Sequence, residues 1–472
     1  MVFQNNVLMG ASGSGTTTYS INQSIRFNPG DSAYMQRTHG AGGNVDASTI
    51  SFWFKRSKLG VEVTMFGTGA DVYNTFDIFF KTDDTLFIQD YASAYTLYLG
   101  TTQVFRDPSA WYHLVFAYDS ANAIETERAR LYINGQRVTS FGGASPSPKY
   151  PSQNADSILG TNVAIGFGRY ISLGSSNTNQ YFDGYLAEMN YVNGLALDPS
   201  SFGEYNDGIW IPKEYSGSYG TGGFFVDGRD SADLGDDESG NGNDLTTSGL
   251  AAHDQVADSP TNNFNTMNPL NPLNGGTLSQ GNLTNVLSGD DQFYTTQELG
   301  FKSYCEVRVD AQSNYGGTLG LGTFGGDDDD NTLVFQTNYL SGYIWLNGGN
   351  ASANIGGTIT TGDVVMMAYD PTTRKWWVGV NGTWRNSGDP ANGTGQVYQH
   401  STTDFGEGIG AIVWGGWKGS ANGLTVTWNF GQDGTFAGQE TAGGNSDGNG
   451  VGNFKYSVPS GFLANCTKNL GS

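Results

Sequence analysis

The sequence is poor in cysteine and histidine. Its 472 residues include two cysteines and four histidines. Two cysteines cannot form a disulfide framework, and neither cysteine has a metal-ligand spacing such as CxxC. The histidines give no HxxxH pair, so zinc chemistry has no support. Cys305 and Cys466 fall in the first and last expected strands of one domain, which leaves a single bridge and two inert thiols both open.

Basic residues and long apolar runs are also scarce. The 22 basic against 45 acidic residues give a formal charge of -23. A chain of this sign is repelled by phosphate backbones and by anionic lipids, so we expect neither nucleic acid nor membrane as a partner. No stretch approaches the roughly 20 apolar residues that span a bilayer. Residues 1–15 lack a basic n-region, so we expect no secretory signal peptide and synthesis that ends in a cytoplasm.

No segment shows a helical period over three turns. Glycine, by contrast, is abundant at 70 residues, and aromatic residues make up 13% of the chain. Glycine supplies turns, and aromatic side chains fit half-buried pleated surfaces. A hydrophobic content of 37% is enough to bury a core. The composition therefore predicts an all-β protein.

Short strand patterns separated by turn residues support this prediction. Apolar residues alternate over 50–55 and again over 112–118, and Asn134-Gly135 lies between two apolar runs, which is typical of a primed-turn hairpin. In the second half, strands expected at 364–369 and 375–380 flank the turn 370–373, and with the next turn they predict a meander.

The chain divides into four expected parts. Residues 1–19 form an N-terminal segment, of which 1–9 could be a peg inserted into a larger particle or a frayed terminus. A first sandwich is expected over 20–215 and a second over 277–472. Between them, 216–276 is polar, acidic and rich in Gly, Asp and Asn, and we expect it to be an irregular connector. Its apolar residues Phe224–Val226 and Leu245 suit docking against a neighbouring domain.

Three groups of motifs resemble known families. The strings at 111–119, 131–135 and 182–189 resemble a laminin-G-like, concanavalin-type jelly roll over about residues 20–205. The strings at 304–309, 362–365 and 375–384, with Gly461-Phe462 near the end, are similar to the SPRY family, another concanavalin-like sandwich. The connector strings at 236–245 and 258–264 resemble a segment found between such domains in virion proteins of tailed bacteriophages. The combination implies a virion component displayed on the particle surface.

Tryptophans in the second half are candidate sugar-stacking residues. Trp384 and Trp417 lie in glycine-rich, polar stretches typical of loops and are the better surface candidates. Trp345 belongs to the same group of tryptophans. Trp376 and Trp377 are adjacent in one strand and must point to opposite faces, so at least one should be in the core. Packing is the simpler interpretation for at least half of this cluster.

Acidic residues of the connector are candidate calcium ligands, because oxygen ligands in flexible loops suit Ca²⁺. These residues are Asp227, Asp230, Asp233, Asp236, Asp237 and Asp244. They do not follow an EF-hand pattern, since the twelfth position from Asp233 is Asp244 and not a glutamate. A second run, 327–330, is better explained as a solvated loop.

The expected function is adhesion without catalysis. No Glu-x-Asp-x-x-Glu string or GxSxG elbow is present, so we do not expect an enzyme. We expect a tail fibre or appendage that binds host-surface glycans weakly, gains avidity from repeated copies as a homo-oligomer such as a trimer, and contacts other virion proteins. Two alternatives stay open: a purely architectural capsid or tail decoration protein, and a glycan depolymerase.

Overall fold

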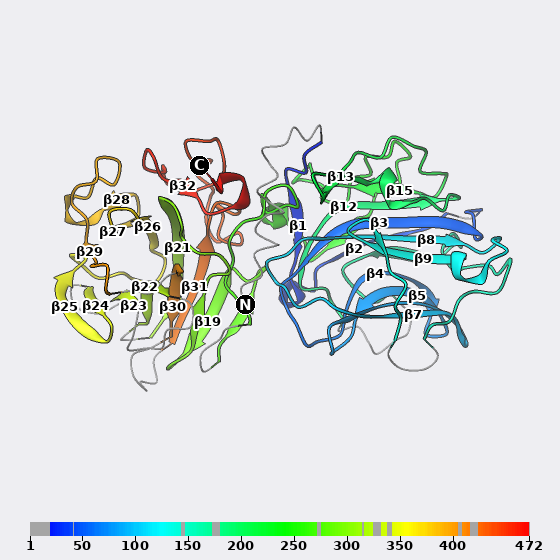
Figure 1. Cartoon of the computed structure of the whole chain (residues 1–472), viewed down its shortest axis with the longest axis horizontal. Helices are drawn as coiled ribbons and strands as arrows, with labels where there is room; N and C mark the ends of the chain where they lie inside the picture. The colour runs from blue at the N-terminus through cyan, green and yellow to red at the C-terminus, as the bar shows by residue number, and fades with distance from the viewer. Residues whose placement is uncertain are drawn as a thin grey trace. The chain divides into compact units, whose positions relative to one another are not determined.

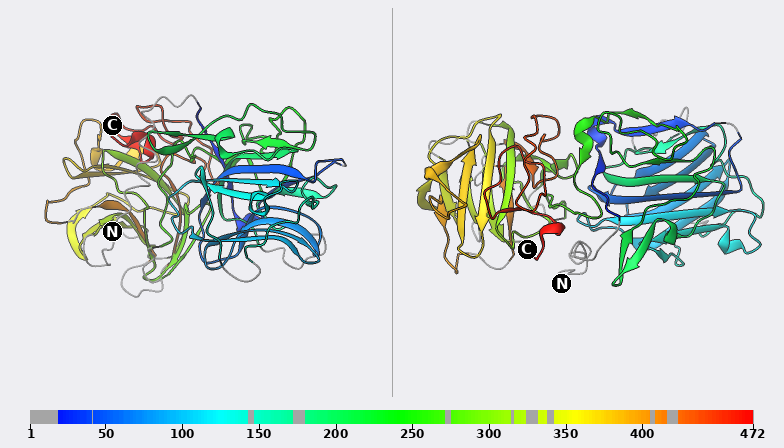
Figure 2. Two further views of the ribbon diagram at one scale, coloured as in Figure 1. Left: turned by 45° about the vertical axis from the view of Figure 1, so that its right-hand side comes forward. Right: turned by 90° about the horizontal axis from the view of Figure 1, so that it is seen from above.

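The protein folds into two units in a computed structural model, and each consists of stacked, mainly antiparallel sheets (Figures 1 and 2). The structure describes residues 19–40, 42–142, 147–171, 180–270, 275–313, 316–323, 332–337, 342–404, 408–415 and 423–471. Unit 1 ends at Thr261 and unit 2 begins at Asn262. Within these ranges there is no α-helix, and no helix is long and apolar enough to cross a membrane. The predicted all-β class is confirmed.

One layer of unit 1, called here the β3 sheet, has the strand order β10-β9-β8-β3-β12-β1-β17, and β15 also pairs with β12. The strands of this sheet are β1 (Ser24–Phe27), β3 (Ala47–Arg56), β8 (Tyr112–Asp119), β9 (Ala129–Ile133), β10 (Gln136–Arg137), β12 (Gly184–Asn193), β15 (Phe224–Val226) and β17 (Gln255–Val256). The predicted hairpin is present, because β9 and β10 pair across Asn134 and Gly135, whose φ angles are 48° and 75°. Positive φ at both central residues is the signature of a type I′ turn.

The other layer, the β5 sheet, has the order β16-β2-β11-β4-β5-β6-β7. Its strands are β2 (Tyr34–Thr38), β4 (Val63–Asp71), β5 (Asn74–Phe80), β6 (Thr85–Ala92), β7 (Tyr95–Val104), β11 (Ala164–Phe167) and β16 (Thr246–Ser248). A separate hairpin joins β13 (Gly203–Asn206) to β14 (Ile209–Pro212). Figure 1 shows β3, β8 and β12 in one layer and β4, β5 and β7 in the other.

The core of unit 1 lies between these layers and follows the predicted alternation. Ile50, Phe52 and Phe54 of β3 face it, as do Leu114 and Phe116 of β8. A strand places alternate side chains on opposite faces, so the intervening residues of β3 lie on the outer side of the sheet. They are buried there as well, because the chain after β12 covers that side.

The segment expected to be an irregular connector is instead largely part of unit 1. β15, β16 and β17 all come from residues 216–261 and pair with β12, β2 and β1. Phe224, Val226 and Leu245 belong to the core of unit 1. These residues therefore complete both sheets of the first sandwich, because burying their apolar side chains outweighs the flexibility that the polar composition suggested.

Unit 2 also has two main sheets. The β21 sheet has the order β18-β19-β31-β21-β26-β27-β28, with β29 paired to β27 and β32 paired to β21, and the β22 sheet has the order β20-β30-β22-β23-β24-β25. The first contains β18 (Thr277–Ser279), β19 (Thr284–Ser288), β21 (Ser303–Gln312), β26 (Val364–Asp370), β27 (Lys375–Val380), β28 (Thr383–Trp384), β29 (Tyr398–Gln399), β31 (Gly423–Asn429) and β32 (Leu463–Ala464). The second contains β20 (Gln292–Tyr294), β22 (Thr318–Thr323), β23 (Thr332–Gln336), β24 (Tyr343–Leu346), β25 (Gly349–Asn354) and β30 (Ile409–Trp414).

The predicted meander is β26-β27-β28. Trp376 and Trp377 point to opposite faces of β27, yet both are buried. Trp376 packs in the core of unit 2, where it stacks on Phe335. Trp377 lies on the other face, and its indole N–H donates to the carbonyl oxygen of Thr394 at 2.8 Å.

Cys305 and Cys466 are both buried and both free thiols. Burial raises the pKa of each thiol, so neither is a reactive thiolate at neutral pH. Of the two alternatives left open by the sequence, the structure has the inert thiols.

Short 3₁₀ turns connect the strands. They are η2 (Pro29–Asp31), η3 (Glu125–Glu127), η4 (Pro199–Ser201), η5 (Ala252–Asp254), η6 (Arg385–Ser387) and η7 (Thr467–Asn469).

Candidate functional site

The outer face of the β5 sheet carries polar and aromatic side chains around a hollow. In β5, Phe76, Ile78 and Phe80 point into the core, so Asp77 and Phe79 point outward. The hollow has a volume of about 250 Å³. It is lined by Glu62, Thr64, Asp77, Phe79, Lys81, Gln89, Tyr95, Tyr98, Tyr170 and Gln180. We call these residues the Asp77 pocket.

Asp77 lies at the base of this pocket and is fully shielded from solvent. Burial raises the pKa of its carboxyl to about 8, against the smaller opposing effect of hydrogen bonds from Gln89 and Thr75. The Gln89 amide donates to one carboxylate oxygen at 3.0 Å. No hydrogen bond of normal geometry reaches the other oxygen from the described residues. Burial therefore favours the protonated, neutral form of this carboxyl at neutral pH.

Aromatic rings form one wall of the pocket. Tyr95 and Tyr98 have ring centroids 4.4 Å apart, and Tyr95 is only half-buried. Lys81 is held next to this wall, because its ammonium donates to the Tyr98 hydroxyl at 2.8 Å and lies 3.8 Å from the centre of the Phe87 ring. A fixed cation and a half-exposed ring give a surface that is flat and polar at its edge.

The opposite wall is a hydrogen-bonded set of polar side chains. Gln180 donates to the exposed carboxylate of Glu62 and accepts from the Thr64 hydroxyl at 3.2 Å. The chain crosses close over Gly67 of β4, where a methyl group would lie 3.1 Å from the carbonyl oxygen of Arg169. A side chain larger than that of glycine would therefore be tightly placed where the chain approaches the sheet.

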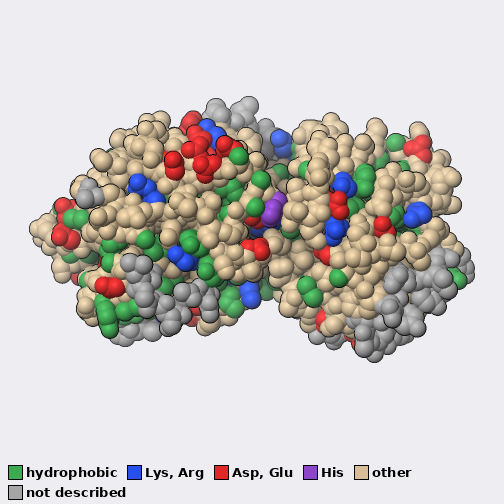
Figure 3. Space-filling model, turned by 180° about the vertical axis from the view of Figure 1, so that it is seen from behind, with side chains coloured by type: hydrophobic (Ala, Val, Ile, Leu, Met, Phe, Trp, Pro, Cys, Tyr) green, Lys and Arg blue, Asp and Glu red, His purple; other side chains and the backbone are tan. Residues whose placement is uncertain are grey.

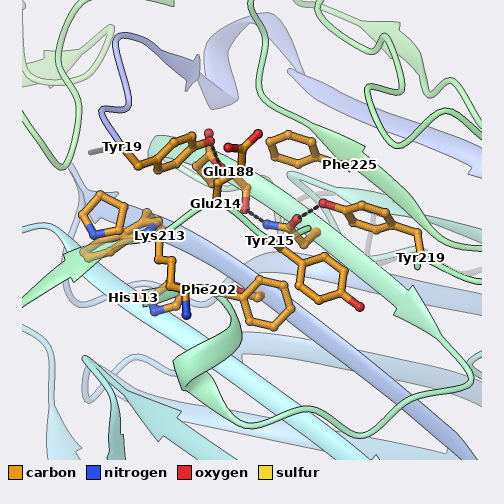
Figure 4. Close-up of a pocket in the computed structure, with 13 residues that line it drawn as sticks. Tyr19, His113, Glu188, Phe202, Lys213, Glu214, Tyr215, Tyr219 and Phe225 are labelled. Carbon is orange, nitrogen blue, oxygen red and sulfur yellow. Dashed lines mark hydrogen bonds between the residues drawn. The ribbon is translucent and has the colours of Figure 1, made fainter. Parts of the chain in front are cut away.

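A second cluster lies on the outer side of the β3 sheet, where Figure 4 shows Tyr19 and Glu188 joined by a hydrogen bond. The Tyr19 hydroxyl donates to Glu188 at 2.7 Å, and burial raises the pKa of that carboxyl to about 7. Glu188 has a left-handed backbone, φ 51°, at an irregularity in the pairing of β12 with β3. The free volume is about 10 Å³, which is room for one water.

His113 of this cluster is a structural residue. Its Nδ1 accepts from the Trp210 indole at 2.9 Å, and its Nε2 lies 2.9 Å from the Ser51 hydroxyl. Its ring stacks on Trp53 at 4.6 Å. Burial lowers the pKa of His113 to about 3, so the ring is neutral and both nitrogens are occupied. The cluster is thus packed too tightly to admit a sugar, and the Asp77 pocket is the better candidate.

The tryptophans chosen from the sequence do not form one site. Trp384 is half-buried and contacts Tyr304 edge-on at 6.3 Å. Trp345 is half-buried against Tyr294, Val334 and Ile412, on the outer face of the β22 sheet. Trp417 lies outside the described residues. Trp384 and Trp345 are thus in different sheets, and their role in sugar binding stays a prediction.

The connector aspartates hold loops together by hydrogen bonds. Asp237 accepts from the backbone N–H groups of Phe225, Ser239 and Asn243. Asp244 accepts from the Asp237 N–H group at 3.1 Å.

The remaining aspartates of this set act locally. Asp227 pairs with Arg229 at 2.7 Å, and Asp230 and Asp233 each accept from a backbone N–H group two residues ahead. No group of three or more acidic, histidine or cysteine side chains in the described part of the chain could hold a metal ion. Asp236 belongs to that described part. The calcium site stays a prediction without a preformed ligand set, and the run 327–330 lies outside the described residues.

The Asp77 pocket was not predicted from the sequence. The signal was Asp77 itself, a charged residue in the middle of the apolar strand 74–80. Such a residue faces outward by alternation, which is ordinary, but here it is fully buried by neighbours from β6, β7 and the chain near 170 and 180. Those neighbours come from distant parts of the sequence, and only the fold brings them together.

The comparisons with known proteins agree with the fold. The model of the Concanavalin A-like lectin/glucanases superfamily matches residues 29–200. Unit 1 contains a concanavalin-like domain. The match includes every residue that lines the Asp77 pocket, and the predicted laminin-G-like, concanavalin-type fold is confirmed. No curated protein sequence matches this chain.

Three solved structures illustrate the range of similar folds. A heptameric SAP-like pentraxin from Limulus polyphemus is 16% identical over 38% of this chain and 79% of its own, with a TM-score of 0.29. The SPRY domain of human HERC1 is 13% identical, and the match covers 34% of this chain and 96% of that domain, with a TM-score of 0.28. Mouse laminin α1 domains LG4-5 are 10% identical, and the match covers 87% of this chain and 88% of the laminin chain, with a TM-score of 0.30. Likenesses at these scores carry no argument about function.

Proposed function

We propose that this protein binds glycans through the Asp77 pocket and is a structural protein displayed on a phage virion, as a tail fibre or appendage that adheres to the host surface. The observation that supports glycan binding is the lining of the pocket. Half-exposed Tyr95 offers a ring face for a sugar, and Gln89, Gln180 and Glu62 offer amide and carboxylate groups for its hydroxyls. Sugar sites combine such rings with a few fixed polar groups.

The virion part of the proposal rests on the sequence resemblance of 236–245 and 258–264 to phage inter-domain segments. Each Asp77 pocket is small and open, so its affinity for one sugar is low. Repeated copies in a homo-oligomer, such as a trimer, would raise the avidity without any new contact. Labelled antibody on intact particles tests the location: decoration of heads, tails or fibres supports the virion role, and unlabelled particles refute it.

Glycan binding is tested by titrating the purified full chain with fragments of host polysaccharide, first on a glycan array and then by calorimetry. Gln89→Ala removes the amide that holds Asp77 and should weaken binding at least tenfold. Gln136→Ala is the matched control, because Gln136 is an exposed residue of the β3 sheet outside the pocket. No binding at millimolar sugar would instead favour a purely architectural role.

Glycan cleavage is a second candidate, and one observation favours it. Glu62 and Asp77 line the same pocket, one exposed and one with a pKa raised to about 8 by burial. Glycoside hydrolysis uses a pair of carboxyl groups in which one is protonated. Release of reducing ends that disappears in Asp77→Asn would establish cleavage, whereas binding without release supports adhesion alone.

A further inference from the structure

Unit 2 contains a separate open hollow that the proposed function does not use. It has a volume of about 340 Å³. It lies where the turn between β26 and β27 meets the residues that follow β29. Leu299, Pro371 and Ile409 give it apolar surface, and Ser401 and Thr402 contribute polar surface.

Arg374 is the one basic side chain other than histidine among the described residues that line this hollow. Its Nε–H donates to the carbonyl oxygen of His400 at 3.3 Å, which orients the guanidinium. In the described part of the chain it forms no ion pair, although acidic groups outnumber basic ones twofold. The two terminal NH₂ groups are thus left to solvent or to a ligand.

The backbone at Arg374 is strained. Its φ is 57°, in the left-handed region that favours glycine or asparagine. The turn is fixed from its first residue, because the Asp370 carboxylate accepts from the N–H groups of Thr372 and Thr373. An arginine in this conformation costs about 1 kcal/mol relative to a glycine. The Arg374 carbonyl oxygen accepts from the His400 N–H group at 3.1 Å, so the turn is fixed at this end as well, and the Arg374 side chain lines the hollow.

The wall next to Arg374 is rigid and uncharged. The Nδ1 of His400 lies 2.9 Å from the carbonyl oxygen of Ser401 and therefore carries the proton, so Nε2 accepts from the Tyr369 hydroxyl at 3.0 Å. The two rings are stacked at 5.9 Å. Burial lowers the pKa of His400, which keeps the ring neutral. Arg374 is therefore the source of positive charge in the hollow.

We propose that the Arg374 hollow binds the carboxylate of an acidic sugar, such as a uronic acid unit of a polysaccharide. A guanidinium fork binds a carboxylate through two parallel hydrogen bonds. The apolar wall suits the face of a sugar ring, and Ser401, Thr402 and the exposed carboxylate of Glu298 suit its hydroxyls. This site lies in the other unit from the Asp77 pocket and does not depend on it.

Calorimetric titration of the full chain with D-glucuronate and with D-glucose tests the site, because the two sugars differ in the carboxylate alone. Glucuronate should bind at least tenfold more tightly than glucose, and its affinity should fall as salt is raised. Arg374→Gly should abolish this preference. Glycine suits the left-handed backbone, so the melting temperature of Arg374→Gly should be equal or higher, and loss of binding cannot then be explained by unfolding.

Two controls make the outcome decisive. Arg385→Gln removes a basic side chain elsewhere in unit 2 and should leave glucuronate binding unchanged. Gln89→Ala, in the Asp77 pocket, should also leave it unchanged, so failure of the first proposal does not affect this one. Equal binding of glucuronate by Arg374→Gly and the native protein, or loss of binding in Gln89→Ala, would overturn the proposal.

Discussion

Lys55 and Asp258 form an ion pair at 2.8 Å in the interior of unit 1, although 203 residues separate them in the chain. The side chains of both are almost completely buried. Asp258 also accepts a hydrogen bond from the Trp111 indole at 3.0 Å, and its backbone carbonyl accepts from the Ser24 hydroxyl at 2.6 Å. The ion pair thus ties the end of unit 1 to the central strand β3, and the Ser24 hydrogen bond ties it to β1.

Breaking this pair should destabilise unit 1 strongly. Lys55→Met leaves Asp258 as a buried charge with one fewer partner, and the expected loss is about 3–5 kcal/mol in the free energy of unfolding. Urea unfolding followed by tryptophan fluorescence measures it. Arg137→Ala breaks a half-exposed pair with Glu127 and should cost less than about 1 kcal/mol. Equal losses in the two variants would contradict the structural role of the buried pair.

The buried carboxyls should make a contribution to stability that falls as pH rises from about 4 to 8. Burial raises the pKa of Asp77 to about 8 and the pKa values of Asp183 and Glu188 to about 7. In this range the folded protein keeps protons that the unfolded chain releases, so the stabilisation is complete below pH 4 and is lost as pH passes the raised values. Each pKa unit of difference corresponds to about 1.4 kcal/mol.

Melting temperatures of the native protein and of Asp77→Asn between pH 4 and 9 provide the measurement. The asparagine is neutral at every pH, so the variant should lose less stability toward pH 9 than the native protein. Parallel curves for the two proteins would show that the Asp77 carboxyl is ionised when folded, contrary to the prediction.

The Asp237 carboxylate should be important for the folding of residues 216–261, because it accepts several of their backbone hydrogen bonds. Asp237→Ala removes the acceptor for three backbone N–H groups and should lower the stability of unit 1 by about 2 kcal/mol or more. Addition of EDTA should leave the melting temperature unchanged, because these hydrogen bonds need no metal. A rise of several degrees with calcium chloride, reversed by EDTA, would instead support the calcium site predicted from the sequence.

Tyr95 should contribute to glycan affinity by ring contact. Tyr95→Ala is expected to weaken binding about tenfold, or roughly 1.4 kcal/mol, while Tyr95→Phe keeps the ring and should have little effect. Tyr73→Ala is the matched control, because Tyr73 is 60% exposed and lies outside the pocket. The ring has no role if Tyr95→Ala binds as tightly as Tyr73→Ala.

Local patterns in the sequence predicted much of the fold. The alternation of Ile50, Phe52 and Phe54 and the Asn134-Gly135 turn are set by neighbours a few residues away, and each was found where expected. The pairing of Phe224 with Tyr191 is not local, and its surroundings in the sequence are polar, so the sequence predicts a connector over 216–276 instead. The burial of Trp377 could not be predicted for the same reason, because the loop that contains Thr394 and covers Trp377 lies outside its own strand.

The site was harder to predict than the fold for a related reason. Aromatic residues that lie close together in the sequence, such as Trp376 and its neighbour Trp377, are buried by packing, and Trp376 lies in the core of unit 2. The residues of the Asp77 pocket are unremarkable one by one, and they become a site only when strands β4, β5, β6 and β7 lie side by side. A pattern search along the chain has no access to that arrangement.

Strands β16 and β17 occupy the margins of the two sheets of unit 1, next to β2 and β1. Their position fixes when this sandwich can close during synthesis: the ribosome must first release the segment up to Asp258. Until then, the rims of both layers are open to any extended peptide that offers matching hydrogen bonds. Rapid completion of unit 1 during synthesis therefore protects the open edges of its two sheets from pairing with a strand of another copy.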